Sequence, residues 1–297
     1  MPHLSLLAIR IPFDPNIISS GSFILSWHGL LSFVGVAVAV YLIARWARKD
    51  KLDPEMVYNT AIWAILGGIA GARIVHVADN WDLYKDNLGN LFAIWSGGIG
   101  LWGAILGGWI AGVIYARISR YPVGKLMDLA APAMLIGQTI GRVGDIINGE
   151  HWSEATGLPW GWYFTHPDSP ARDGAQRFFG DPQTPVHPTV VYEMIWNMAV
   201  LALLFRLKGK LKPDGSLWMV YLALYAVGRF MIQFFRLDPE KFWGLQEAHL
   251  IAILVVLVAV PFIVLKTRWK KPGEDGGAPV PQGTSRAERR RRARDTR

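Results

Sequence analysis

The sequence contains no cysteine, and this absence limits the chemistry that the chain can carry out. A chain without thiols forms no disulfide, builds no thiolate metal site and offers no cysteine nucleophile. The sequence also lacks a P-loop, a His-Glu-x-x-His zinc helix, a Gly-x-Ser-x-Gly elbow and a Ser/Lys pair of the signal-peptidase kind. We therefore expect no metal and no cofactor, and any thiol chemistry must use a thiol that a substrate brings.

Charged residues are scarce, because Asp, Glu, Lys and Arg make up 18% of the 297 residues whereas 52% of the residues are hydrophobic. The formal net charge of +8 comes from basic residues that are confined to a few short stretches. This composition argues against a disordered chain and against a protein that coats nucleic acid. It is typical of an integral membrane protein.

Seven stretches are long and apolar enough to cross about 30 Å of hydrocarbon as helices of about 20 residues. They lie at residues 23–44, 57–78, 93–115, 126–147, 187–205, 216–235 and 248–265. The first stretch is not a cleaved signal peptide, because its basic flank follows it instead of preceding it. The sequence thus predicts an all-α integral membrane protein with about seven transmembrane helices.

The distribution of Lys and Arg predicts the orientation of these helices. Most basic residues fall in the connections 45–56, 116–125 and 206–215 and in the tail that begins at Lys266. The opposite side holds only Arg10, Lys85, Arg172, Arg177, Arg236 and Lys241. Because basic loops remain in the cytoplasm, we expect the N-terminus outside and the C-terminus in the cytoplasm.

The chain divides into a seven-helix transmembrane domain, residues 1–271, and a tail, residues 272–297. The tail is Gly/Pro-rich and then basic, so we predict that it is disordered, cytoplasmic and attracted to anionic lipid rather than to nucleic acid. Between the fourth and fifth helices, residues 148–186 are rich in Trp, Pro, Gly and Asp. We interpret this insertion as a small folded extracytoplasmic cap, and an ordinary aromatic loop at the membrane interface is the equal alternative.

Three arginines lie within or at the ends of three different predicted helices: Arg73, Arg142 and Arg229. An arginine near the bilayer centre costs about 2.5–3.5 kcal/mol on insertion, so it normally faces a partner or a wet cavity. Small-residue helix packing explains most of the glycines in segments 67–71 and 97–112, but it does not explain Arg73. Other polar residues in or beside apolar helices are Asp128, Asp145, Asn148, Glu150, Glu193 and Gln233. Together with the arginines, they predict a polar cavity that opens outward. They also predict that the protein acts chiefly by binding anions and stabilising charge.

The spacing of Arg142 and Asp145 places them on one helical face, with Asn148 one turn further on. A guanidinium held by a carboxylate suits a phosphate oxygen, because arginine presents a planar fork of donors and stays charged. A purely structural Arg–Asp pair is the alternative that this spacing leaves open.

Two more helices supply polar partners. Glu193 lies within reach of an arginine on another helix, and we favour this structural pairing over a catalytic role. Arg229 and Gln233 share a face at a spacing of four residues, and we expect Arg236 to extend toward lipid headgroups.

In the order of its motifs, the sequence resembles the bacterial prolipoprotein diacylglyceryl transferases. The specific motif is Gly-Arg-x-Gly-x-x-x-Asn-Gly-Glu, which here runs from Gly141 to Glu150. The other matching segments are Trp27-His28-Gly29-Leu30, Gly97-Gly98 before Trp102-Gly103, His187-Pro188 with Tyr192-Glu193, and Arg229 with Phe234-Phe235-Arg236.

The resemblance implies an enzyme of the bacterial plasma membrane whose active site faces the extracytoplasmic side. Such enzymes transfer the diacylglyceryl group of phosphatidylglycerol to the lipobox cysteine in the signal peptide of a preprolipoprotein. A thioether forms and glycerol phosphate leaves, which is the first step of lipoprotein maturation. The implied partners are therefore the donor lipid, the preprolipoprotein and the membrane, and not nucleic acid.

The resemblance also implies roles for individual residues. Arg142 binds the lipid phosphate, and Arg229 stabilises the headgroup or the leaving group. The remaining residues of the phosphatidylglycerol site are Arg73, Asn148 and Glu150, and the structural supports are Asp145, Glu193 and Gln233.

Four positions depart from the family pattern. The tyrosine of the family is His28 here, its histidine or tyrosine after the glycines is Trp102, its asparagine is Asp145 and a glutamate is Gln233. Because an indole cannot accept a proton, Trp102 is not the base. His28, with an ordinary pKa of about 6.5, could deprotonate the thiol, and a histidine satisfied by a backbone carbonyl is an equally strong alternative.

Two functions of other classes remain open at this point. The arginines could gate an anion or lipid transporter, although the sequence lacks inverted repeats and paired broken helices. The four departures could also mark a non-catalytic paralogue that binds a lipid or a prolipoprotein.

Overall fold

The structure is a computed structural model that describes residues 8–21, 23–85, 87–93, 98 and 100–271. The chain divides within α1 and within α4 into two compact units. Of the described residues, the first unit comprises those up to 39 together with 130–270, and the second comprises those in 40–129. The tail that we predict to be disordered, residues 272–297, lies outside the described residues.

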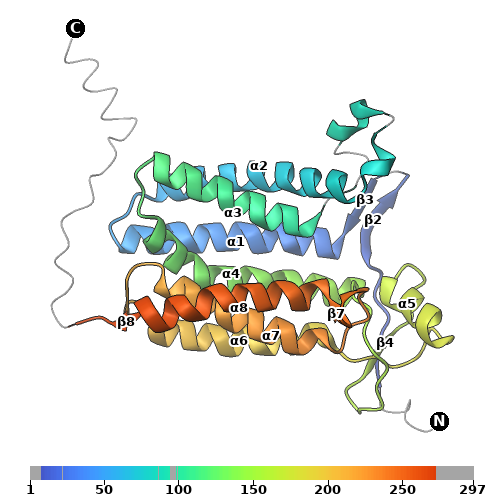
Figure 1. Cartoon of the computed structure of the whole chain (residues 1–297). Helices are drawn as coiled ribbons and strands as arrows, with labels where there is room; N and C mark the ends of the chain where they lie inside the picture. Colours follow the sequence, from blue (N-terminus) through green and yellow to red (C-terminus); the bar gives the residue numbers. More distant parts are fainter. Residues whose placement is uncertain (1–7, 22, 86, 94–97, 99, 272–297) are drawn as a thin grey trace. The chain divides into compact units, whose positions relative to one another are not determined.

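Helices account for most of the described residues (Figure 1). They are α1 (Trp27–Lys49), α2 (Pro54–Asp79), α3 (Leu101–Ile118), α4 (Val123–Asn148), α5 (Pro170–Phe179), α6 (Thr189–Leu207), α7 (Ser216–Gln233) and α8 (Glu247–Lys266). The strands are short: β1 (Ile9–Ile11), β2 (Asn16–Ser20), β3 (Phe23–Ser26), β4 (Trp162–Phe164), β5 (Leu211–Lys212), β6 (Glu240–Phe242), β7 (Leu245–Gln246) and β8 (Arg268–Trp269).

Six of the described helices are long and apolar enough to cross a membrane, namely α1, α2, α3, α6, α7 and α8. Helix α4 is also long, with 26 residues, but it carries several charged side chains. The protein is therefore a helical, multi-pass membrane protein.

Two helices begin later than the sequence predicts. Residues 23–26 form β3, which pairs antiparallel with β2, so the first helix starts at Trp27. The third helix starts at Leu101 instead of residue 93, beyond Gly98 with a φ of +75°. Glycine adopts this left-handed conformation readily, and the conformation interrupts a helix. Residues 94–97 and 99 of this predicted helix lie outside the described residues.

The core of the first unit forms where α4, α6 and α7 meet, and α7 and α8 lie side by side (Figure 1). Leu135, Leu204 and Tyr221 are among its buried side chains, and the amide of Gln138 donates to the Tyr221 hydroxyl at 3.1 Å. This apolar packing fixes the helices whose polar residues form the candidate site.

The start of α1 lies directly against α4 at Gly144. A Cβ atom at this glycine would lie 2.8 Å from the His28 Cα and 2.9 Å from the Trp27 carbonyl oxygen. Any side chain at Gly144 would push α1 away, so the glycine brings His28 close to the end of α4.

The 148–186 insertion is folded. Its strand β4 pairs in parallel with β1, and α5 follows it. Trp162, Phe164 and Ala171 of the insertion pack with Ile11 and Val190 in a second buried cluster. This cluster anchors the insertion on the N-terminal strand and on the start of α6.

In the second unit, α2 and α3 pack through glycines. The backbones of Gly67 and Gly71 on α2 face those of Gly103 and Gly107 on α3. A Cβ atom on Gly107 would lie 3.0 Å from the Gly71 Cα and closer still to the Gly67 carbonyl oxygen. The prediction that small residues allow close helix packing is confirmed here.

We expect Gly107→Ala to lower the thermal unfolding midpoint of the purified protein in detergent, because overpacking typically costs about 1–3 kcal/mol. Gly112→Ala on the same helix is the control, since its Cβ would lie 3.4 Å from the Ala64 Cβ, an ordinary contact. Both changes gain the same helix propensity, so the difference between them reports packing. Equal midpoints for the two variants would contradict the close approach.

Candidate active site

A buried carboxylate joins two arginines from different helices in the first unit. Arg142 on α4 donates from Nη2 to Glu193 Oε1 on α6 at 2.6 Å. Arg229 on α7 approaches the other oxygen, Glu193 Oε2, at 3.5 Å. The prediction that Glu193 pairs with an arginine of another helix is confirmed. One carboxylate thus holds three helices together at a polar point.

The other side of Arg142 is held within α4. Its Nη1 donates to Asp145 Oδ2 at 2.5 Å, as the spacing of three residues predicts. Helix α4 ends at Asn148, and the next residue, Gly149, has a φ of +69°, which glycine commonly supplies at a helix C-terminus. Arg142 is therefore oriented by two carboxylates, one from its own helix and one from α6.

Asn148 and Glu150 lie beside this cluster. The Asn148 Nδ2 donates to Glu150 Oε1 at 2.9 Å, and its Oδ1 accepts the backbone N–H of His28 at 3.2 Å. Asn148 therefore joins the end of α4 to the start of α1.

His28 contacts a carboxylate, not the backbone carbonyl that we considered from the sequence. Its Nδ1 bonds to Asp145 Oδ1, and its side chain is 44% exposed whereas that of Asp145 is 2% exposed. The carboxylate fixes the proton of the neutral ring on Nδ1, which leaves Nε2 as a proton acceptor. Asp145 thus contacts His28 with one oxygen and Arg142 with the other.

Arg236 is buried, which corrects the expectation that it extends toward lipid headgroups. Its side chain is 6% exposed, and its Nε pairs with Asp238 Oδ2 at 3.3 Å. The amide of Gln246 donates to the Arg236 carbonyl at 2.7 Å and holds the turn after α7 inward. Burial lowers the pKa of Arg236 to about 10.

Gln233 supports this same turn. It is fully buried, and its Nε2 donates to Asp238 Oδ2 at 2.6 Å and contacts the Gln246 side chain. The sequence predicts only that Gln233 shares a helical face with Arg229. In the structure, the hydrogen bonds of Gln233 hold the segment after α7.

His151 belongs to the cluster, and the sequence did not predict it. It lies just beyond α4, where its Nδ1 is 2.7 Å from Arg236 Nη2 and its Nε2 is 3.0 Å from Arg142 Nη1. Burial, together with the charges of Arg236 and Arg142, lowers the pKa of His151. The available signal was its place directly after the Asn-Gly-Glu motif.

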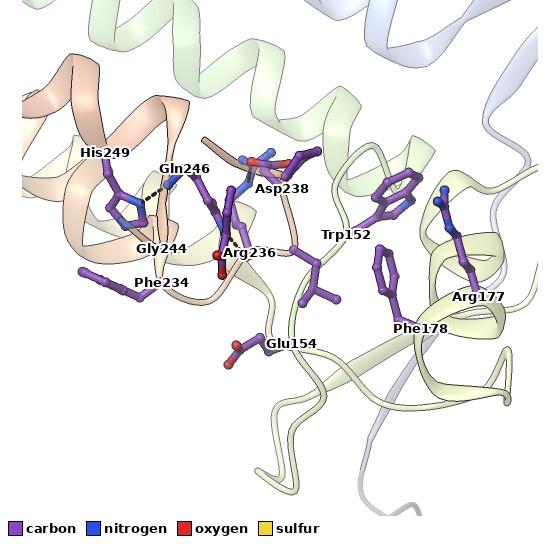
Figure 2. A pocket seen from close by; sticks show the side chains of 13 residues that line it. Trp152, Glu154, Arg177, Phe178, Phe234, Arg236, Asp238, Gly244, Gln246 and His249 are labelled. Carbon is purple, nitrogen blue, oxygen red and sulfur yellow. Dashed lines mark hydrogen bonds and ion pairs between the residues drawn. The ribbon is translucent and has the colours of Figure 1, made fainter. Parts of the chain in front are cut away.

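A cavity of about 560 Å³ opens beside Arg236 (Figure 2). Its lining combines charged and aromatic side chains, among them Glu154, Asp238, Phe178 and Phe234. The first unit therefore has space for a polar ligand next to Arg236 and Arg177.

Arg73 lies in the second unit and is bonded to backbone carbonyls. Its Nε donates to the Leu91 oxygen at 2.8 Å, Nη1 to the Gly98 oxygen at 3.0 Å and Nη2 to the Asn90 oxygen at 2.5 Å. The guanidinium also lies 5.1 Å from the centre of the Tyr84 ring. These contacts join Arg73 on α2 to Asn90, Leu91 and Gly98.

Among the described residues, one group has side chains that a metal ion could use. The ligand atoms of Asp14, His166 and Asp168 lie within 4.8 Å of one another. However, the Asp168 backbone N–H donates to His166 Nδ1 at 3.3 Å, which places the proton of the neutral ring on Nε2, facing Asp14 at 3.8 Å. One hydrogen bond and one longer polar contact therefore link these residues.

The helices and the buried arginines define a class, that of multi-pass membrane proteins with a cationic site inside a helix bundle. The chain belongs to the prolipoprotein diacylglyceryl transferase family, whose sequence model matches residues 15–265. The resemblance seen in the motifs is thereby confirmed.

Several relatives carry the name phosphatidylglycerol–prolipoprotein diacylglyceryl transferase. The protein of Thermosynechococcus vestitus is 36% identical over 239 residues, which cover 80% of this chain and 86% of the relative. That of Trichormus variabilis is 34% identical over 268 residues, with 88% and 92% covered. That of Gloeobacter violaceus is 36% identical over 252 residues, with 83% and 90% covered.

We expect Glu193→Gln to destabilise the protein, because removing one partner of a buried ion pair leaves uncompensated charge and typically costs about 3–5 kcal/mol. The thermal unfolding midpoint in detergent measures this effect. The control is Glu154→Gln, which changes an exposed carboxylate in the same way. A midpoint that falls no further in Glu193→Gln than in the control would show that Glu193 does not hold the cluster together.

Proposed function

We propose that the protein transfers the diacylglyceryl group of phosphatidylglycerol to the cysteine thiol of a preprolipoprotein. A carbon–sulfur bond forms, the bond between the glyceryl carbon and the phosphate oxygen breaks, and glycerol phosphate leaves. The observation that carries this proposal is the pair of partly buried guanidiniums, Arg142 and Arg229, that share the buried carboxylate of Glu193. The names of the relatives support the same reaction.

In this mechanism Arg142 and Arg229 stabilise the negative charge that gathers on the departing phosphate. Donors that are oriented before the reaction need no rearrangement as the charge develops, and such stabilisation is often the largest catalytic contribution. Asp145 and Glu193 provide the orientation of Arg142. Arg229 lies further from Glu193 than Arg142 does, so its attraction to that carboxylate is weaker. It therefore loses less interaction energy when it turns to a phosphate.

The other predicted residues support this site. We assign Asn148 and Glu150 to the shape of the lipid-binding region, since they join the end of α4 to α1. Arg73 keeps a supporting role, because three carbonyls already engage its guanidinium.

His28 is the proposed base for the thiol. Its Nε2 can accept the proton while Asp145 holds Nδ1, and its exposure leaves the ring accessible to a substrate. The carboxylate also stabilises the imidazolium that forms, as it does in other His–Asp pairs.

The proposed topology has seven membrane-spanning helices, because α4 spans the membrane in addition to the six apolar helices. The N-terminus, the 148–186 insertion and the active site then lie on the extracytoplasmic side of the bacterial plasma membrane. The basic connections 45–56, 116–125 and 206–215 support this orientation.

We expect Arg142→Ala and Arg229→Ala each to lower the transfer rate by about 10²–10³-fold or more, as is typical when one charge-stabilising donor is lost. Labelled phosphatidylglycerol and a lipobox peptide, with cysteine or with serine, provide the assay in detergent. Only the cysteine peptide should acquire label. Arg172→Ala, on the half-exposed face of α5, is the control. Full activity of either site variant would overturn the mechanism, and an unlabelled cysteine peptide with the parent protein would overturn the function.

We expect His28→Gln to lower kcat by about 10²–10⁴-fold, because glutamine can donate to Asp145 but cannot accept the thiol proton. The rate of this variant should recover partly as the pH rises toward about 8.5, where a cysteine ionises without a base. The control is His166→Gln, outside the cluster. A parent-like rate and pH profile for His28→Gln would exclude His28 as the base.

A further inference from the structure

We propose that Arg236 is a third guanidinium of the anion site and that His151 is the residue that positions it. The ligand class is a phosphate ester, either the diester of the donor lipid or the monoester that leaves. This inference rests on the proposed function and adds two residues to its site.

The hydrogen-bond chemistry of His151 follows from its partners. A guanidinium can only donate, so the 2.7 Å contact from Arg236 Nη2 makes His151 Nδ1 an acceptor. The proton of the neutral ring then lies on Nε2, which faces Asp145 Oδ2 at 3.5 Å. Arg142 Nη1 donates to the same oxygen at 2.5 Å. The 3.0 Å approach of Arg142 to Nε2 is thus a side-by-side contact of two donors to one carboxylate.

The charges around His151 keep its ring neutral. On α4 it faces Arg142 and Asp145, and beyond α7 it faces Arg236. The next groups outward are Glu193 on α6, Arg229 on α7 and Asp238 in the turn after α7. A second proton on the ring would remove the acceptor for Arg236 and add a positive charge between two arginines. The lowered pKa of His151 agrees with this arrangement.

The position of Arg236 suits an anion. It lines the cavity of about 560 Å³ (Figure 2). His151 joins the same side chain to the cluster of Arg142 and Asp145. Among the described residues, this cluster contains three guanidiniums but only two buried carboxylates, those of Asp145 and Glu193. Asp238, the remaining partner of Arg236, is half-exposed. A phosphate that enters from the cavity would therefore meet Arg236 and supply negative charge that the buried carboxylates do not.

The test measures KM for phosphatidylglycerol and kcat separately, with the full chain in detergent. A contact that holds the phosphate equally in the ground and transition states raises KM and leaves kcat almost unchanged. We expect Arg236→Gln to raise KM by about tenfold to a hundredfold, the usual effect of losing a charged hydrogen bond. Arg172→Gln should leave KM unchanged. The inference would be overturned if Arg236→Gln had a parent-like KM for phosphatidylglycerol and a parent-like inhibition constant for glycerol phosphate. Transfer activity of the parent enzyme would still support the proposed function in that case.

Variants of His151 separate positioning from folding. His151→Leu should raise KM because Arg236 loses its acceptor, and His151→Gln should restore it because the amide oxygen accepts the same bond. As the pH falls through the lowered pKa of His151, KM of the parent should rise, whereas KM of His151→Gln should stay level. The donor phosphodiester does not titrate in this range. Matched pH profiles for the parent and His151→Gln would show that His151 has only a structural role.

Inhibition by glycerol phosphate distinguishes the two sources of the anion. If Arg236→Gln weakens this inhibition more than it raises KM for the lipid, Arg236 serves the leaving group. If it mainly raises KM, Arg236 serves the donor. Either result supports a phosphate site at Arg236.

Discussion

A buried carboxylate needs positively charged partners, because it has lost its hydration. Glu193 is buried and pairs with Arg142 and Arg229. Each of these three residues comes from a different helix, so the charges can be buried only when α4, α6 and α7 are packed together. Ion pairs of this kind contribute little net stability, but the loss of one partner is severe. The pairing therefore specifies which helices meet, and it positions the two guanidiniums to which the proposed mechanism assigns the phosphate. The packing of the apolar core and the chemistry of the site depend on the same contact.

Sequence alone predicted the features that depend on local spacing or on the cost of buried charge. The apolar helices, the Arg142–Asp145 pair and the partnership of Glu193 with an arginine follow from these two constraints. Contacts made by the turns between the helices did not follow. His151 and Arg236 are 85 positions apart, and their contact depends on a turn held by Gln246, which no periodicity reveals. The late start of the third helix likewise depends on a single glycine conformation.

The departures from the family pattern are related in space. His28 and Asp145 are 117 positions apart, yet they bond to each other. In the motif that the chain resembles, these positions hold a tyrosine and an asparagine. Two of the four departures therefore meet in one contact, in which an imidazole faces a carboxylate. Gln233 is explained differently, by the buried turn that it supports. No contact of this kind explains Trp102.

The two oxygens of Asp145 contact His28 and Arg142, so in the proposed mechanism one carboxylate links proton transfer to bond cleavage. In that mechanism, His28 takes the proton of the thiol and its new positive charge attracts the carboxylate more strongly. The attraction between Asp145 and Arg142 then weakens, and more of the guanidinium charge becomes available to the departing phosphate. The proposal thus couples activation of the nucleophile to stabilisation of the leaving group through a single side chain.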